Sequence, residues 1–595
     1  MKKYFKLIKE AFEGIGAIYI VHFIVLFFSV FFQVLSSFMS KILIDTLKGD
    51  IFLAPQAGSL ELFIANLLGG PQFLRDNLWV FSIIIVTIAL AVALMAFSRF
   101  IIRSYIGPGM AKNMQLKLFY HIERLPYPFM KKARSGDLIQ TCTRDEDVFR
   151  RFMTREAYSI VYTFLIVIFS FSILFSINWQ LALISMTLLP LLFIYSFFVI
   201  KEVRVRYRRT DDSEGLMTSK IEENLASVRV VKAYNNESYE IQSFEESLTD
   251  YRKKYIHWRK LSAFFFSSSD VFVFGQILLT TLFGIAQAYR GEITVGTLVV
   301  GFTFVNMMVW PIRDVATILS NMARALASMD RLLIILNEPV EDTTTGTNPA
   351  IKGEIVFENV AYQFDDAKEP VLHDVNLKIK KGATVAVLGK TGAGKSTLAH
   401  LLTRLYDPTS GRILVDGHDI TEMSRSHIRQ NVATVLQEPF LFSKTIISNI
   451  RIANPNASQE EVYTAARIAD IHDNIMTFKQ GYETPVGEKG VTLSGGQRQR
   501  LAIARTIINK APILIFDDSL SAVDTETDIN IRSALKKRAE DTTTLIITHR
   551  IATAKDADLI IVLEDGTISE QGTHEELIAR KGLYQRVYEI QTKLG

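Results

Sequence analysis

The sequence predicts a polytopic α-helical membrane domain of six transmembrane helices with long cytosolic extensions, followed by an α/β domain with a parallel sheet core. Two observations predict this. Before about residue 335 the chain contains long apolar runs such as Ile18–Leu35, Leu78–Phe97 and Ile160–Ile177, each close to the roughly 20 residues that a helix needs to cross a bilayer core. After that point charged and apolar residues alternate, as in a water-soluble domain. A chain of 595 residues also exceeds one ordinary domain.

Charge and cysteine content exclude several classes of protein. The net charge is only +4, and we see no basic stripe of the kind that binds nucleic acid, so no nucleic-acid partner is expected. Cys142 is the single cysteine, which excludes a disulfide framework. The first apolar run is too long for a cleavable signal and further spans follow it, so we expect a multi-pass protein of the cytoplasmic membrane.

Six segments are long and apolar enough to span the bilayer. They are expected near residues 17–46, 78–106, 156–178, 180–202, 259–290 and 293–328. Some exceed simple spanning length, so these helices should project beyond the membrane. Met1–Glu13, in which lysines alternate with apolar residues, suits a helix lying in the lipid interface, with an ordinary cytosolic lead-in as the alternative.

The distribution of lysine and arginine predicts the orientation of these spans. The connections after the second and fourth spans are rich in both residues, whereas loop 47–77 has only Lys48 and Arg75, and the connection around Asn178 has none. Positive connections stay on the cytosolic side, so both termini and both basic connections are expected there. Residues 211–257 keep apolar positions at helical spacing, which predicts a helical extension rather than a disordered loop.

Three ionisable residues fall within or beside the last two spans. Asp270, Arg313 and Asp314 are candidates for function, because charged residues inside membrane helices are usually functional or face a cavity. The alternative is that they lie in the cytosolic extensions or pair with one another.

The second half contains a phosphate-binding motif in its proper setting. Residues 337–352 lack apolar periodicity and read as a linker, so we expect a membrane domain over 1–336 and a second domain over 353–595. In the latter, an apolar strand at Val385–Leu388 leads into G-x-x-x-x-G-K-S and a helix, the phosphate-loop pattern of a P-loop NTPase. The residues expected to bind ATP here are Gly389, Thr391, Gly392, Ala393, Gly394, Lys395, Ser396 and Thr397.

Three residues of this and a second motif are expected to bind the phosphates or the metal ion. Lys395 should reach the β- and γ-phosphates, and the Ser396 hydroxyl should ligate Mg²⁺. Ile513–Asp517 is an apolar strand that ends in a carboxylate suited to holding the same ion. Binding of ATP with Mg²⁺ is therefore expected.

The segment Leu493-Ser-Gly-Gly-Gln497 resembles the signature sequence of ABC transporters, specifically exporters with fused membrane and nucleotide-binding domains. The resemblance covers essentially the whole chain. In that family two ATPase domains meet head to tail, so each ATP lies between one domain's phosphate loop and the other's signature. The resemblance implies that Ser494, Gly495, Gly496 and Gln497 contact the ATP of a partner half-transporter, and that a dimer is required.

Further roles are carried over by matching motifs. Gln437 resembles the loop glutamine that touches Mg²⁺ and the attacking water, and His549 resembles the switch histidine that contacts the γ-phosphate. Asp524 resembles the end of the loop that crosses to the opposite site. Phe364 aligns with the aromatic residue that stacks on adenine, with Tyr362 as the alternative. Two segments, 129–135 and 234–244, match the helices that couple the ATPase to the membrane domain.

One catalytic position departs from the family pattern. Where the family places a glutamate that polarises the attacking water, this chain has Asp518. The shorter side chain retracts the carboxylate, and a misplacement of about 1 Å can reduce a rate roughly 100-fold. We expect an impaired site, as in one subunit of heterodimeric bacterial multidrug exporters; a competent aspartate in a homodimer is the alternative.

The function expected from this resemblance is ATP-driven export of amphipathic or hydrophobic substrates across the cytoplasmic membrane. Drugs, lipids and apolar peptides remain open as cargo. An importer on the exporter scaffold, as in siderophore-type uptake, a homodimeric lipid or multidrug flippase, and an ATP-gated regulator without net pumping are the alternatives.

Overall fold

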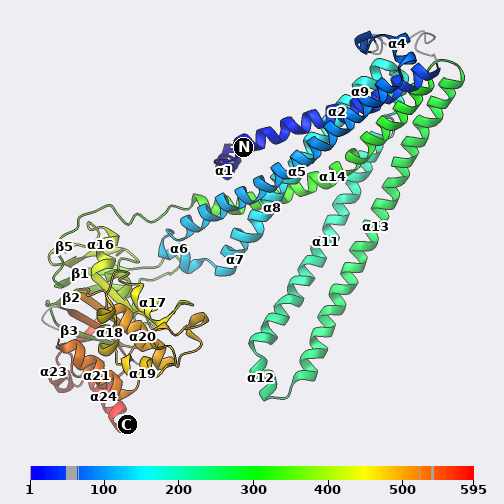
Figure 1. The fold of residues 1–595 in the computed structure, drawn as a ribbon. Coiled ribbons are helices and arrows are strands. Elements are labelled where there is room, and N and C mark those ends of the chain that lie inside the picture. The colour runs from blue at the N-terminus through cyan, green and yellow to red at the C-terminus, as the bar shows by residue number, and fades with distance from the viewer. Residues whose placement is uncertain (1, 49–62, 65, 521–522, 538–541, 595) are drawn as a thin grey trace. The chain divides into compact units, whose positions relative to one another are not determined.

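The computed structural model describes residues 2–48, 63–64, 66–520, 523–537 and 542–594 (Figure 1). It divides into two compact units. One contains Met1–Glu123 and Arg134–Glu338, and the other contains Arg124–Ala133 and Pro339–Gly595. The chain therefore passes between the units three times, because a ten-residue segment of the first half belongs with the second.

The first unit is entirely helical in its described part. Its elements in chain order are α1 (Lys2–Ala11), α2 (Gly16–Lys48), α4 (Pro71–Asp76), α5 (Trp79–Ile122), α7 (Ser135–Gln140), α8 (Glu146–Arg151), α9 (Ala157–Ile177), α10 (Trp179–Ile184), α11 (Leu189–Ala226), α12 (Val228–Ala233), α13 (Glu237–Tyr289) and α14 (Val295–Asn337). Single π-helical turns at Thr141–Asp145 and Phe152–Glu156 join α7, α8 and α9 into one continuous helix.

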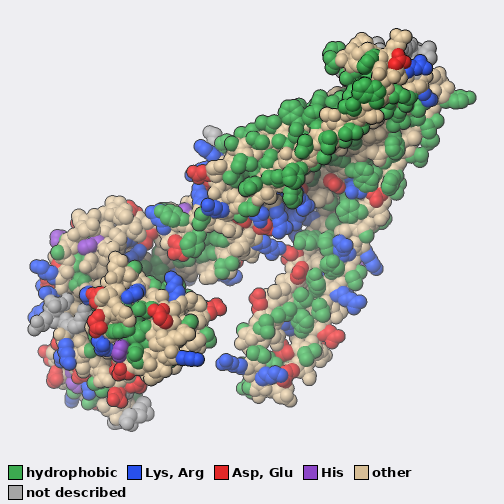
Figure 2. Space-filling view, in the orientation of Figure 1, with side chains coloured by type: hydrophobic (Ala, Val, Ile, Leu, Met, Phe, Trp, Pro, Cys, Tyr) green, Lys and Arg blue, Asp and Glu red, His purple; other side chains and the backbone are tan. Residues whose placement is uncertain are grey.

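Six helices in the described residues are long and apolar enough to cross a membrane, which confirms the expected number of spans. They cover Gly16–Lys48, Trp79–Ile122, Ser135–Ile177, Trp179–Ala226, Glu237–Tyr289 and Val295–Asn337. The expected extensions are present: α13, for example, is 53 residues long. Large hydrophobic side chains remain exposed along these helices (Figure 2), as suits surfaces that face lipid rather than water.

Two polar clusters inside this unit bear on the sequence predictions. Arg313 is ion-paired with Asp270 at 2.8 Å and lies 3.5 Å from Asp314, so the three candidates pair with one another, as the alternative interpretation held. Near the other end of α14, the buried carboxylate of Asp45 accepts hydrogen bonds from Lys41, from the Thr294 hydroxyl and from the Gly296 amide.

The second unit is built on two sheets. An antiparallel sheet has the strand order β2 (Leu372–Ile379), β1 (Ile355–Tyr362), β4 (Ser410–Val415) and β5 (His418–Asp419). The larger sheet has the order β10 (Thr567–Gly572), β9 (Leu559–Glu564), β3 (Thr384–Gly389), β8 (Thr543–Ile547), β7 (Ile513–Asp517) and β6 (Val432–Val435). Only β10 is antiparallel there, so the predicted parallel core is confirmed.

The described helices of this unit are all short, the longest being the 13-residue α20 (Gly495–Ile507). They are α6 (Tyr127–Lys132), α15 (Lys395–Leu402), α16 (Arg425–Asn431), α17 (Ile446–Arg451), α18 (Gln459–Ile468), α19 (His472–Met476), α20 (Gly495–Ile507), α21 (Thr525–Lys536), α22 (Ile551–Ala554), α23 (His574–Ala579) and α24 (Leu583–Leu594).

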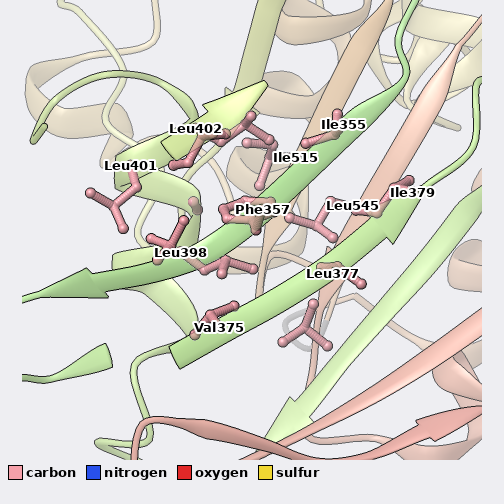
Figure 3. Close-up of a cluster of buried hydrophobic side chains, with 14 of the residues drawn as sticks. Ile355, Phe357, Val375, Leu377, Ile379, Leu398, Leu401, Leu402, Ile515 and Leu545 are labelled. Atoms are coloured by element: carbon pink, nitrogen blue, oxygen red, sulfur yellow. The ribbon is translucent and has the colours of Figure 1, made fainter. Parts of the chain in front are cut away.

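Two main hydrophobic cores support the sheets. The first joins both sheets to α15 and is centred on Phe357, with Leu398, Ile515 and Leu545 around it (Figure 3). The second packs α17, α18, α19 and α20 against the other face of the large sheet, around Phe516. Burying an aliphatic or aromatic side chain of this size contributes about 1.5–3 kcal/mol. These cores hold the ends of β3 and β7, where the predicted site residues lie.

The segment expected as a linker is fixed against the second unit. Glu341 forms a two-point ion pair with Arg429, at 2.6 and 2.8 Å, and its amide donates to the carbonyl oxygen of Arg124. The His427 ring bonds the carbonyl oxygen of Pro349 at 2.7 Å. Residues 339–352 are therefore part of the second unit's surface.

Candidate ATP site

The phosphate loop connects β3 to α15 at the carboxyl edge of the large sheet. Two glycines make this turn possible. Gly389 has φ of 154°, and a Cβ there would lie 2.4 Å from the carbonyl oxygen of Leu563 on the next strand. Gly394, the N-cap of α15, has φ of 95°, and a Cβ would lie 2.6 Å from Leu372. Larger residues would be strained or would clash at both positions.

The loop presents a mixture of open and buried residues. Thr391 and Gly392 are exposed, whereas Ala393, Gly394, Lys395 and Thr397 are buried. Ser396 is half-buried at the first turn of α15. The N-terminus of that helix, with its unpaired backbone N–H groups and its partial positive charge, favours an anion at this place.

Lys395 lies inside the loop that surrounds it. Its Nζ donates to the carbonyl oxygens of Gly389 and Lys390, both at 2.9 Å. Burial lowers the pKa of Lys395, and the charges of Asp518 and Asp517 oppose that shift. A buried ammonium group that donates to neutral carbonyl oxygens is well placed to exchange them for the oxygens of a phosphate.

Ser396 and Asp517 come together as the sequence predicts. The Ser396 hydroxyl donates to Asp517 Oδ1 at 3.1 Å. Burial raises the pKa of Asp517, and the hydrogen bond from Ser396 opposes the shift. A hydroxyl and a buried carboxylate form an all-oxygen donor set, which fits a small hard cation such as Mg²⁺. The chemistry of the donors therefore agrees with the expected metal.

Gln437 and Asp518 follow neighbouring parallel strands. Gln437 comes two residues after β6 and is exposed, while Asp518 directly follows β7, and Val435 of β6 pairs with Phe516 of β7. Both residues therefore emerge at the same edge of the sheet. The Asp518 amide donates to the carbonyl oxygen of Ile547 at 2.9 Å, and its φ is 46°, in the left-handed region.

His549 lies two residues after β8, the strand between β3 and β7 in the large sheet. Its side chain is exposed. Its backbone is fixed by α24 through Gln591, a residue that sequence reasoning missed. Gln591 Nε2 donates to the carbonyl oxygen of His549 at 2.8 Å, and its Oε1 accepts from the amide of Ile551 at 2.9 Å. A cavity of about 270 Å³ lies here, lined by Gly389, Lys390, His549 and Gln591 among others. The polar residue in the helical stripe Tyr584, Val587, Gln591 is the signal that could have identified it.

The signature residues begin α20. Ser494 is its N-cap and forms a capping box with Gln497: the Gln497 amide donates to Ser494 Oγ at 3.2 Å, and the Ser494 amide donates to Gln497 Oε1 at 2.9 Å. Ser494 and Gly495 are exposed and Gly496 is half-buried. Leu493 belongs to the second core, whereas Ala393 of the phosphate loop belongs to the first. Asp524, in turn, caps α21 through the Thr527 amide.

Phe364 packs in an aromatic cluster that also contacts α6. Its ring packs edge-on against Tyr362 and Tyr406, with centroid separations of 4.9 and 5.4 Å, and Lys131 Nζ lies 4.3 Å from the Phe364 centroid. Tyr127 of α6 in turn contacts Tyr406, at 5.5 Å between ring centroids. Tyr362, the alternative candidate, is buried. Of the two rings, Phe364 is the one that remains partly accessible.

The first predicted coupling segment, 129–135, overlaps α6 (Tyr127–Lys132) but begins later and ends later than that helix. The second, 234–244, begins in the turn before α13 and continues into its first residues. Within the loop of Asp524, Ser521 and Ala522 lie outside the described residues.

A phosphate-binding edge and six membrane-length helices on one chain are the arrangement of a membrane-bound transport ATPase. Comparison with known proteins agrees. Residues 12–312 match the family model described as "ABC transporter transmembrane region", and residues 372–521 match the model described as "ABC transporter". The chain belongs to the ABC transporter family.

Several relatives and one solved structure resemble the chain over most of its length. The uncharacterised ABC transporter ATP-binding protein YknU of Bacillus subtilis (strain 168) is 35% identical, over 80% of this chain and 82% of its own. The putative multidrug export ATP-binding/permease protein YgaD of the same strain is 35% identical, over 80% and 83%. A bacterial Atm1-family ABC exporter solved with ATP bound superposes with a TM-score of 0.78 at 26% identity, covering 95% of this chain and 97% of that one.

Proposed function

We propose that this chain is one half of a dimeric exporter that uses ATP to move amphipathic or hydrophobic compounds across the cytoplasmic membrane. The observation that carries the proposal is the pairing of six membrane helices with a complete phosphate loop and an exposed signature on one chain. The relatives named as multidrug export proteins support the direction and the class of cargo. On this proposal residues 1–336 form the membrane domain, 337–352 the connection and 353–595 the ATPase domain.

We propose the following roles in the ATP site, which the family resemblance suggests and the geometry above supports. Lys395 and the amides of the phosphate loop bind the β- and γ-phosphates, Phe364 stacks on adenine, and His549 contacts the γ-phosphate. Ser396, Asp517 and Gln437 would hold Mg²⁺, which would supply positive charge that neutralises the phosphates. Asp518 orients the attacking water and accepts its proton. Fixed positive charge around the phosphates supplies most of the catalysis.

A second chain completes each site on this proposal. Ser494, Gly495, Gly496 and Gln497 lie at an exposed helix N-terminus whose supporting core differs from that of the phosphate loop. That position suits contact with ATP held by another ATPase domain. Because Asp518 is shorter than glutamate, we assign the slow site of a heterodimer to this chain, and its signature serves the faster site of the partner.

Two measurements test this function. Inverted membrane vesicles containing the full chain and its partner should accumulate a fluorescent amphiphile only when ATP is added, and Lys395→Ala should abolish the accumulation. Movement of the compound toward the ATPase side would instead identify an importer, and equilibration without accumulation would exclude a pump.

The second measurement is ATP turnover by the chain purified alone. We expect slow turnover, because its own site lacks the glutamate. Rapid hydrolysis that is lost in Asp518→Ala would contradict the heterodimer and support a homodimeric flippase.

A further inference from the structure

Two adjoining hollows lie among α11, α13 and α14, at the end of the apolar part of α11. The larger, of about 280 Å³, is lined mainly by aromatic and hydroxyl side chains, with Tyr207, Trp258 and Phe265 among them. The smaller, of about 210 Å³, is lined by Phe193, Phe197 and Leu319 among others. Ile200 and Arg204 line both, so the two are contiguous. Their size approaches the roughly 300–1,000 Å³ of small-molecule sites.

The charges in these hollows have one sign. Lys201 lines the smaller hollow, Arg324 the larger and Arg204 both, while no described residue that lines either is acidic. Among the described residues Arg204 is half-buried and forms no ion pair, and its Nε is buried without a hydrogen-bond partner. Arg324 donates to Asn321 Oδ1 at 2.5 Å. Asn321 Nδ2 in turn donates to Glu156 Oε1 at 2.9 Å, so the neutral amide of Asn321 stands between Arg324 and that carboxylate.

Arg313, on the same helix as Arg324, has its positive charge balanced by a carboxylate. Arg313 is paired with Asp270 at 2.8 Å and lies over the ring of Trp310 at 4.7 Å. A buried guanidinium group without a counter-charge is unfavourable in a weakly polar environment. Arg204 is half-buried and lacks the negative charge that Arg313 already has, while Arg324 is exposed to solvent and also has no ion pair among the described residues.

The aromatic side chains that line the larger hollow indicate that the rest of the ligand is apolar. The Tyr207 and Trp258 rings contact each other edge to face at 5.2 Å, and Phe266, about two turns beyond Trp258 on α13, adds an exposed ring. Flat apolar bodies pack well on such rings, and a guanidinium fork binds carboxylate, sulfonate or phosphate oxygens through two N–H groups.

We propose that these hollows bind an organic anion, with its acidic group between Arg204 and Arg324 and its aromatic or aliphatic body against Tyr207, Trp258 and Phe265. The site narrows the cargo of the proposed exporter to amphipathic anions, and so rests on that function. Lys201, at the start of the basic part of α11, attracts the anion toward the hollow.

The test measures binding without ATP. The chain has four tryptophans, so replacing Trp79, Trp179 and Trp310 by phenylalanine leaves Trp258 as the reporter inside the site. The probe is anilinonaphthalene sulfonate, and the matched neutral probe is phenylnaphthylamine, which has the same rings without the sulfonate. Both quench tryptophan by energy transfer, and the full chain with its partner is held in phosphatidylcholine nanodiscs.

We expect Arg204→Gln with Arg324→Gln to weaken binding of the sulfonate about tenfold or more, because charge-assisted hydrogen bonds are lost. Binding of the neutral probe should change less than about twofold, which also shows that the variant is folded. Arg204→Lys should retain most of the sulfonate affinity. Arg208→Gln, an exposed position one turn along α11 that lines neither hollow, is the matched control.

Three outcomes would overturn the proposal. They are unchanged sulfonate binding in the double variant, an equal loss for both probes, and a loss of sulfonate binding when phosphatidylglycerol is added to the nanodiscs. The last would identify an anionic lipid headgroup as the occupant. ATP-driven transport that fails while sulfonate binding persists would contradict the proposed function alone, so the two failures are distinguishable.

Discussion

At the scale of single residues, Asp518 combines a catalytic position with an unusual backbone conformation. Its φ of 46° lies in the left-handed region, where aspartate and asparagine are enriched over longer side chains. The same residue therefore fits the turn after β7 better than glutamate would, and places its carboxylate closer to the backbone than the family's glutamate.

We predict that Asp518→Glu increases ATP turnover of the chain purified alone about 10–100-fold, because the carboxylate regains its reach. The free energy of unfolding should fall by about 1 kcal/mol or less, since glutamate is less favourable at positive φ. Steady-state hydrolysis and thermal unfolding measure the two effects. Asp518→Asn is the control: it keeps the turn but should lower turnover further. A glutamate variant no faster than the wild type would contradict this account.

The buried ammonium group of Lys395 predicts a pH dependence. Burial lowers its pKa in the nucleotide-free site, and a bound triphosphate would raise that pKa again. Binding therefore takes up a proton as the pH approaches the lowered pKa, and ATP affinity should fall as the pH rises from neutrality toward the ordinary lysine pKa of about 10.4. Calorimetric titration in buffers of different ionisation enthalpy measures the uptake. In Lys395→Arg, which stays charged, the slope should vanish; a persisting slope would assign it to another group.

At the scale of elements, α24 acts as a support for the loop that carries His549. The side-chain amide of Gln591 uses both its donor and its acceptor on that loop. This contact was beyond sequence reasoning, because it joins residues about 40 positions apart through a short C-terminal helix. The phosphate loop, in contrast, is fixed by local spacing, and its residues lie where the motif places them.

We predict that Gln591→Leu lowers kcat about tenfold in the Asp518→Glu background, where turnover at this site is measurable, because the His549 loop loses both hydrogen bonds and shifts. ATP affinity, which depends mainly on the phosphate loop, should stay nearly constant. Gln585→Leu is the matched control, since Gln585 lies on the same helix and bonds only Glu589 among the described residues. An equal fall in both variants would indicate loss of the helix rather than of the contact.

Sequence patterns predicted some elements better than others for a physical reason. Long apolar runs report lipid exposure directly, so the six spans were predicted in number and in order. The antiparallel sheet β2-β1-β4-β5 was not predicted, because its strands alternate buried and exposed residues only over short stretches. The anchoring of residues 339–352 was also missed, since Glu341 finds Arg429 only after folding.

At the scale of the whole molecule, α6 belongs structurally to the ATPase unit although it lies in the sequence of the membrane half. Tyr127 contacts His400 and Tyr406, with centroid separations of 5.6 and 5.5 Å, and Lys132 pairs with Asp365 at 3.0 Å. The ATPase unit is therefore incomplete without ten residues that a cut in the linker would remove.

We predict that a synthetic peptide of residues 124–133 stabilises an isolated fragment of residues 339–595, because a ligand that binds only the folded state raises its stability. At saturating peptide the Tm should rise by about 2–4 °C for each kcal/mol of binding. The same peptide with Tyr127→Ala should have a much smaller effect. No shift with the native peptide would contradict the assignment of α6 to this unit.

The three chain crossings also restrict how such a transporter can be recombined. A chimaera that exchanges everything after residue 338 would replace His400, Tyr406 and Phe364 but keep the old Tyr127 and Lys131. The foreign ATPase domain would then pack against an α6 whose side chains do not match its surface. A working graft must carry residues 124–133 along with the ATPase, so the smallest exchangeable module of this protein is discontinuous in its gene.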